Sequence, residues 1–166
     1  MEGNLFTIPP RYTIDSSSLM DIFGPATMMV SKQVTPGLWE RLAKLILSGL
    51  VISHIEVLYE IRKDGTKGEE LYDWANSHTE VFRDYAWNTE GAVIKTMSPR
   101  YSAFVNQKVG DIYADPWLVA QAKTRSLTLI TEEKPKPSAD ATRHKLPNVC
   151  THYQVSTVNL VELIKE

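Results

Sequence analysis

Cysteine is almost absent from this chain, which has 166 residues and a single cysteine, Cys150. One cysteine cannot form an internal disulfide, so the disulfide-dense scaffolds of small secreted proteins are excluded. Cys150 also has no second cysteine or suitably spaced histidine with which to build a zinc site. This scarcity is typical of proteins from a reducing compartment, and we expect a cytoplasmic protein.

Long apolar runs are missing as well. No stretch approaches the roughly 20 apolar residues of a membrane-spanning helix. Residues 1–15 lack the basic start, apolar stretch and cleavage site of a secretion signal, so we expect no membrane association. The composition, 43% hydrophobic and 23% charged, is that of an ordinary globular protein. We predict a single domain over residues 1–166, with a loose arm at residues 1–9.

Positive charge is also in short supply, because the formal net charge is -2. A protein that binds nucleic acid through a general positive field is expected to be basic. Either this chain does not bind nucleic acid, or it binds through a local basic patch and metal ions. The four histidines form no His-x-x-x-His spacing, and no glycine-rich phosphate loop is present. Zinc hydrolases and the common nucleotide-binding proteins are therefore disfavoured.

The pattern of apolar residues and helix breakers predicts an α/β chain. Short apolar strands are predicted at 12–14, 51–53, 127–130 and 155–158. Helices are predicted from Ser16, over 36–49, 55–63, 66–77 and 115–125, over 80–109 with a break near Ser98-Pro99, and after an Asn159 cap. Residues 134–145 are predicted to form a loop. Strands with little polar alternation favour a short central parallel sheet in a three-layer α/β/α fold.

Acidic residues occur where a parallel sheet places its sites, at the carboxyl ends of strands. Asp15 directly follows the first predicted strand, and Glu132-Glu133 follow the strand at 127–130. Carboxylates brought together repel one another unless a cation neutralises them, and hard oxygen ligands suit Mg²⁺ or Mn²⁺. The candidate ligands are the acids that follow strands or lie near helix starts: Asp15, Glu56, Glu60, Asp111, Asp115, Glu132 and Glu133.

Each of these acids also has an ordinary structural interpretation. Asp15 and Asp115 could cap the helices that follow them, and for Asp115, which precedes Pro116, the sequence alone favours this role. Glu60 could pair with Lys63 on a solvated helix face. Glu132-Glu133 could be solvated charge at the end of a strand. The joint placement of the acids, rather than any one of them, indicates a site.

Four stretches of the chain resemble the motifs of PIN domains. They are residues 12–19, which resemble the opening strand with its terminal acid; 52–61, which resemble the second strand and the helix with a Glu-Leu pair; 114–120, which resemble the helix start with the third acid; and 129–133, which resemble the strand ending in Thr, any residue, then an acid. The likeness extends from Tyr12 to Ile164. Residues 145–150 and the end of the chain look closest to an uncharacterised bacterial PIN-like branch related to VapC-type toxins.

This resemblance implies a Mg²⁺- or Mn²⁺-dependent endoribonuclease whose ligands are Asp15, Glu60, Asp115 and Glu133. Glu56, Asp111 and Glu132 are less certain ligands, and the hydroxyls of Ser17 and Thr131 are expected to support the site. It also implies an RNA substrate, a homodimer and, if the protein is the toxin of a toxin–antitoxin pair, a small antitoxin partner. Two alternatives remain: a non-catalytic PIN-like module that binds RNA or a protein, and an α/β protein that binds a small molecule or nucleotide.

Two further groups of residues bear on RNA binding. A basic patch could form from Lys123, Arg125, Lys134, Lys136, Arg143 and Lys145, although a lysine-rich loop is usually only solvated surface. Aromatic rings that could stack a base are Trp87, Tyr101, Tyr113 and Trp117, although most such rings are expected in the core.

Overall fold

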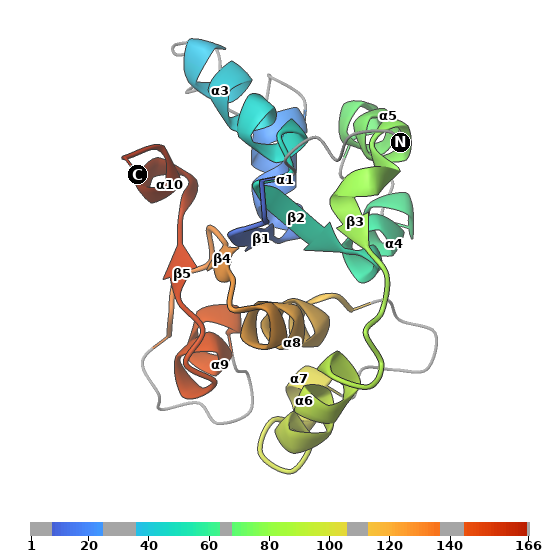
Figure 1. Ribbon diagram of the computed structural model, residues 1–166, viewed down its shortest axis with the longest axis vertical. Helices are drawn as coiled ribbons and strands as arrows, with labels where there is room; N and C mark the ends of the chain where they lie inside the picture. The colour runs from blue at the N-terminus through green and yellow to red at the C-terminus, as the bar shows by residue number, and fades with distance from the viewer. Residues whose placement is uncertain (1–7, 25–35, 64–67, 106–112, 137–144, 166) are drawn as a thin grey trace, which may run out of the picture.

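A parallel sheet of five short strands forms the centre of the computed structural model (Figure 1). The structure describes residues 8–24, 36–63, 68–105, 113–136 and 145–165. The strand order is β3-β2-β1-β4-β5, and every neighbouring pair is parallel. The strands are β1 (Tyr12–Ile14), β2 (Val51–His54), β3 (Phe82–Arg83), β4 (Thr128–Ile130) and β5 (Thr157–Val158). All residues of β1 and β2 are buried, which explains why these strands carry no polar alternation.

Helices cover both faces of this sheet (Figure 1). One side carries α1 (Ser16–Phe23), α3 (Pro36–Leu47), α4 (Ile55–Lys63) and α5 (Glu69–Ser77). The other side carries α6 (Glu90–Met97), α7 (Ser102–Val105), α8 (Asp115–Arg125) and α9 (Leu146–His152). The chain ends with α10 (Leu160–Lys165) after β5. The predicted three-layer α/β/α fold with a short central parallel sheet is confirmed.

Helix α8 lies against the centre of the sheet and fixes the position of the residues at its start. Its residues from Leu118 to Ala122 are all buried. Among them is the polar Gln121, which accepts a hydrogen bond from the Thr13 hydroxyl at 2.6 Å and donates to the Ser53 carbonyl at 3.4 Å. The side chain of Gln121 thus ties α8 to both β1 and β2. A buried polar group needs such partners, because burial without them is costly.

Several expected elements are confirmed in detail. The helix predicted over 36–49 is present as α3, which buries Trp39, Leu42 and Ile46. The cap predicted at Asn159 is present: its side chain accepts from the Glu162 N–H at 2.8 Å, and Glu162 accepts from the Asn159 N–H at 2.9 Å. This reciprocal pair is a capping box. No helix in the described ranges is long and apolar enough to cross a membrane.

Other predictions about the fold are wrong. Residues 80–109 are not one broken helix, because the chain there forms a 3-10 turn (Thr79–Val81), strand β3, and only then α6 and α7. Helix α9 and strand β3 have no counterpart in the prediction, and the last strand covers only Thr157–Val158. Helix α5 begins at Glu69 rather than at residue 66. Predictions for residues 1–7, 106–112 and 137–144 lie outside the described residues.

Candidate metal centre

Asp15 lies directly after β1 and begins the site. It is buried, and its side chain accepts a hydrogen bond from the Ser18 N–H at 2.7 Å, so Asp15 is the N-cap of α1. Burial raises the pKa of this carboxyl, while hydrogen bonds from Thr131, Ser18 and Ser17 oppose the rise. Both hydroxyls predicted to support the site, those of Ser17 and Thr131, therefore act on Asp15. The helix-cap interpretation of Asp15 is correct, and it leaves the second carboxylate oxygen for other partners.

Asp115 is the second acid of the site and lies at the start of α8. Burial and the negative charges of Glu60, Glu133 and Asp15 together raise its pKa to about 7. The N-cap interpretation of this residue is wrong, because Ala114 is the N-cap of α8 and Asp115 is the first helical residue. Its carboxyl instead forms a hydrogen bond with the Tyr113 hydroxyl. The structure thus brings the four acids singled out by the sequence into one electrostatic group, which we call the acidic cluster: Asp15, Glu60, Asp115 and Glu133.

Backbone N–H groups hold the other two members of the acidic cluster. Glu60 is on α4, and its Oε1 accepts from the Ala114 N–H at 2.9 Å, directly before Asp115. Glu133 follows β4, and its Oε2 lies 3.4 Å from the Leu146 N–H and 3.6 Å from Lys145 Nζ. The four carboxylates therefore come from four separate parts of the chain that meet at the carboxyl edge of the sheet, as expected for a parallel α/β fold.

The competing acids have other partners. Glu56 accepts a hydrogen bond from the Tyr85 hydroxyl, and Glu132 accepts from the Leu160 N–H at 2.7 Å at the start of α10. The negative charges of Glu60 and Glu133 are, after burial, the largest causes of the raised pKa of Asp115. The geometry therefore favours Glu60 over Glu56 and Glu133 over Glu132. Asp111 lies outside the described residues.

Sequence reasoning missed two residues beside the acidic cluster. Asp21 is half-buried on α1. Burial and the negative charges of Glu132 and Asp15 together raise its pKa to about 6. Its position four residues after Ser17 places both on one helix face, which is the signal that could have identified it. Tyr113 was considered only as a stacking ring, but its hydroxyl contacts Asp115. Burial and that negative charge raise the pKa of Tyr113.

The donor chemistry of the acidic cluster suits a hard divalent cation. The negative charges of Glu60, Glu133 and Asp15 raise the pKa of Asp115. A bound cation would relieve the repulsion among these carboxylates. In the described ranges, no three acidic, histidine or cysteine side chains are close enough together to hold a metal ion as they stand. Glu60 and Glu133 accept hydrogen bonds from backbone N–H groups.

A comparison with protein families decides where the chain belongs. Residues 12–166 match DUF4411, a domain of unknown function. The chain is a member of the DUF4411 family. No curated protein and no solved structure matches it.

The basic residues of the DUF4411 domain do not gather into one patch among those described. Lys123 and Arg125 lie in the last turn of α8, about 12 and 15 Å along the helix from Asp115. Arg125 pairs with Glu90 across 3.5 Å. Lys145 is the one predicted base that contacts the acidic cluster in the described ranges, through Glu133. Lys134 and Lys136 are exposed, and Arg143 lies outside the described residues.

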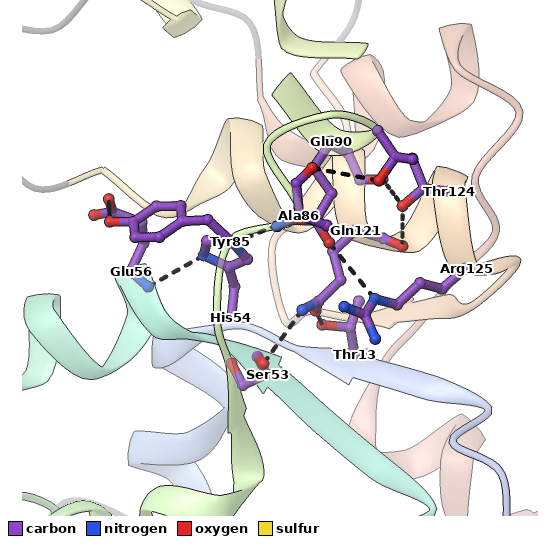
Figure 2. A network of polar contacts seen from close by, with 12 residues as sticks. Thr13, Ser53, His54, Glu56, Tyr85, Ala86, Glu90, Gln121, Thr124 and Arg125 are labelled. Atoms are coloured by element: carbon purple, nitrogen blue, oxygen red, sulfur yellow. Dashed lines mark hydrogen bonds and ion pairs between the residues drawn. The ribbon is translucent and has the colours of Figure 1, made fainter. Parts of the chain in front are cut away.

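A buried polar network in the DUF4411 domain connects the helices that carry Glu60 and Asp115 (Figure 2). At the end of β2, His54 is fully buried, and its Nδ1 accepts from the Glu56 N–H at 3.1 Å. Its Nε2 therefore carries the hydrogen, and this atom lies 3.4 Å from Oε2 of the equally buried Glu90. Glu90 also accepts from the Ala86 N–H at 3.0 Å. The network fixes the start of α4 relative to α6 and α8.

Proposed function

We propose that this protein is a Mg²⁺- or Mn²⁺-dependent endoribonuclease whose site is the acidic cluster of Asp15, Glu60, Asp115 and Glu133. The observation that supports the proposal is the meeting of these four carboxylates, from four parts of the chain, around the buried start of α8. A structural cap or a surface ion pair needs only one acid. A cluster of acids whose mutual repulsion hinders their ionisation is what a cation site requires before the cation binds.

The side chains of the acidic cluster would have different roles in such a site. Asp15 is buried and Asp115 is half-buried, and they form hydrogen bonds with Thr131 and Tyr113 respectively. Glu60 and Glu133 are half-buried and can turn from their backbone partners toward a ligand. A bound divalent cation would supply positive charge for the phosphate and make water more acidic. Lys145, beside Glu133, is placed to offset negative charge on an approaching RNA backbone.

The proposal extends to the biological setting that the PIN resemblance implies. It comprises cytoplasmic location, an RNA substrate, a homodimer and a toxin role with a small antitoxin that covers the acidic cluster. Sedimentation of the purified chain tests the dimer, for which we expect twice the mass of the 18.8 kDa monomer. A monomer at all concentrations would remove the dimer from the proposal.

Manganese binding provides the first test of the metal site. We expect Mn²⁺ at about 100 times its Kd to stabilise the wild-type protein by about 3 kcal/mol and raise Tm by several degrees. Asp15→Asn should abolish this shift, because it removes a buried ligand. Asp73→Asn, an exposed acid on α5, is the matched control and should keep the shift. A wild-type protein whose melting curve is unchanged by millimolar Mn²⁺ would contradict the metal site.

RNA hydrolysis provides the second test. With Mn²⁺, the wild-type protein should cut mixed single-stranded RNAs, and Asp115→Asn should reduce the rate by more than about 100-fold. Even residues that only orient metal ligands often cost 10- to 100-fold, so loss of a ligand should cost more. Asp73→Asn again serves as the control. Binding of Mn²⁺ without any RNA cleavage would favour the non-catalytic PIN-like module instead.

A further inference from the structure

Trp87 exposes an indole ring that its neighbours hold in one orientation. The residue is 64% exposed. Its ring stacks on Tyr85, with centroids 4.5 Å apart and planes inclined by 20°, and meets Trp117 edge-on at 5.0 Å. Tyr85 and Trp117 are themselves in edge contact at 4.8 Å. We call Tyr85, Trp87 and Trp117 the aromatic platform.

A buried histidine supports the aromatic platform from below. His54 stacks on Trp117 at 5.1 Å with an interplanar angle of 17°, and contacts Tyr85 edge-on at 5.2 Å. His54 is in turn fixed by Glu56 and Glu90 (Figure 2). The rings are thus ordered before any ligand arrives, so a ligand that stacks on Trp87 does not have to order them.

The aromatic platform stands beside the acidic cluster. The Tyr85 hydroxyl donates to Glu56, which precedes Glu60 by one helical turn, about 6 Å. Trp117 follows Asp115 by two residues in the first turn of α8. Tyr85 comes two residues after β3, which runs parallel to β2, so it follows the carboxyl end of its strand as Asp15 follows that of β1.

We propose that the aromatic platform binds an unpaired nucleobase of a single-stranded RNA, stacked on the outer face of Trp87, next to the phosphate at the acidic cluster. This inference rests on the proposed nuclease function and narrows its substrate to single strands. Base-paired RNA would not fit, because its bases are already stacked and their faces are covered. Stacking of this kind tolerates any base, because every base has a π-face.

The surroundings of Trp87 favour a base over a protein partner. The other large apolar side chains that are exposed in the described ranges lie on other elements: Ile8, Leu47, Tyr72 and Val161. In the part of the chain that the structure describes, no other large apolar side chain of the segment between β3 and α6 is mostly exposed, whereas protein interfaces generally require a broad apolar patch. One flat, preordered ring at the edge of a phosphate-cleaving site matches a nucleotide instead.

Oligonucleotide binding tests the proposal in the full-length chain. Binding of a labelled oligouridylate is measured by fluorescence anisotropy in Mg²⁺, with Asp115→Asn in every protein to prevent cleavage. Trp87→Ala should weaken binding about 10-fold, in line with the loss of one stacked base. Trp87→Phe, which keeps a ring, should restore most of the affinity. Tyr72→Ala removes another exposed ring, on α5, and should bind like the parent protein.

Three probes separate this proposal from the nuclease proposal. An oligonucleotide that is abasic at successive positions should lose affinity at one position, and Trp87→Ala should remove that sensitivity. A blunt RNA duplex should bind weakly and be indifferent to Trp87→Ala. Equal affinity of Trp87→Ala and Tyr72→Ala for the single strand would overturn the platform, even if the wild-type protein cuts RNA. Conversely, platform-dependent binding by a wild-type protein that cuts nothing would sustain the platform and refute the nuclease.

A change in self-association would point to a different occupant. If Trp87→Ala alters the sedimentation of the protein while oligonucleotide affinity stays the same, the exposed ring serves a protein contact and the base-binding proposal fails.

Discussion

Replacing Asp115 with asparagine is expected to stabilise the cation-free protein at pH 8. Burial and the negative charges of Glu60, Glu133 and Asp15 together raise the pKa of this carboxyl from 3.8 to about 7. At pH 8 the carboxyl is therefore harder to ionise in the folded state than in the unfolded state. The difference corresponds to at most about 4 kcal/mol of unfolding free energy above pH 7. An asparagine at this position would keep the shape of the side chain without the charge, and we expect a gain of about 2–4 kcal/mol.

The effect of Asp115→Asn on the free energy of unfolding depends on pH and on bound Mn²⁺. Stability associated with a raised pKa is fully present below the unfolded value of 3.8 and is lost as pH rises through about 7. The advantage of Asp115→Asn should therefore grow from pH 4 to pH 8 in guanidinium unfolding with a chelator present. Saturating Mn²⁺ should turn the advantage into a deficit, because the variant lacks a ligand. Asp73→Asn should show neither trend, and an Asp115→Asn protein that is no more stable than wild type at pH 8 would contradict the buried cluster.

The sequence predicts the centre of the fold well because the central strands are buried on both faces. Residues 12–14 and 51–53 are short apolar runs without alternation, and burial of every residue in β1 and β2 is the physical cause of that pattern. The carboxyl-edge rule accounts for the positions of two of the four acids, since Asp15 and Glu133 follow the neighbouring strands β1 and β4. The pattern of apolar residues was therefore sufficient to predict structure where it depends on neighbouring residues in the sequence.

The missed elements depend on contacts between distant parts of the chain. β3 has only two residues, Phe82 and Arg83, and exists because they pair with Ser53 and His54 of β2. No local propensity predicts so short a strand, since strand preference is largely a matter of neighbours. Helix α9 is similar: its seven residues include a proline at the start and bury four side chains against the core. Burial of that kind cannot be inferred from a segment with no clear period.

The same limit applies to the site. The hydrogen bond from the Ala114 N–H to Glu60 joins residues 54 positions apart, so only the folded structure could favour Glu60 over Glu56 by contact. The approach of Asp21 to Glu132 also depends on tertiary packing. His54 looked like an isolated histidine in the sequence, whereas in the structure it connects the aromatic platform with Glu90.

Truncating Glu90 to alanine is expected to be the most destabilising single change in the polar network. Glu90 is fully buried, and it partners His54 Nε2, the Ala86 N–H and Arg125 Nε, which is 3.5 Å away. Glu90→Ala would remove the acceptor beside the buried His54 Nε2 and the acceptor of the half-buried Ala86 N–H, and would release the guanidinium. Leaving a buried donor without an acceptor costs about 1–3 kcal/mol, and we expect a loss of about that size in guanidinium unfolding at pH 7. Glu90→Gln, which keeps hydrogen-bonding atoms in place, should lose less.

The pH dependence distinguishes this network from simple packing. Burial raises the pKa of Glu90, but hydrogen bonds from His54 and Ala86 and the charge of Arg125 outweigh it, so the pKa lies below its usual 4.5. The stability that the carboxylate provides is therefore present above pH 4.5 and is lost as pH falls through the lower folded value. The gap between wild type and Glu90→Gln should narrow in that acidic range.

Glu69 provides the matched control, because it opens α5 as Glu90 opens α6 but is exposed. Glu69→Ala should change the free energy of unfolding by less than about 0.5 kcal/mol. A second readout links the network to the site: Glu90→Ala should weaken Mn²⁺ binding in protein that remains folded, since His54 fixes the start of α4, which carries Glu60. If Glu90→Ala and Glu69→Ala unfold at the same guanidinium concentration, Glu90 does not hold these helices together.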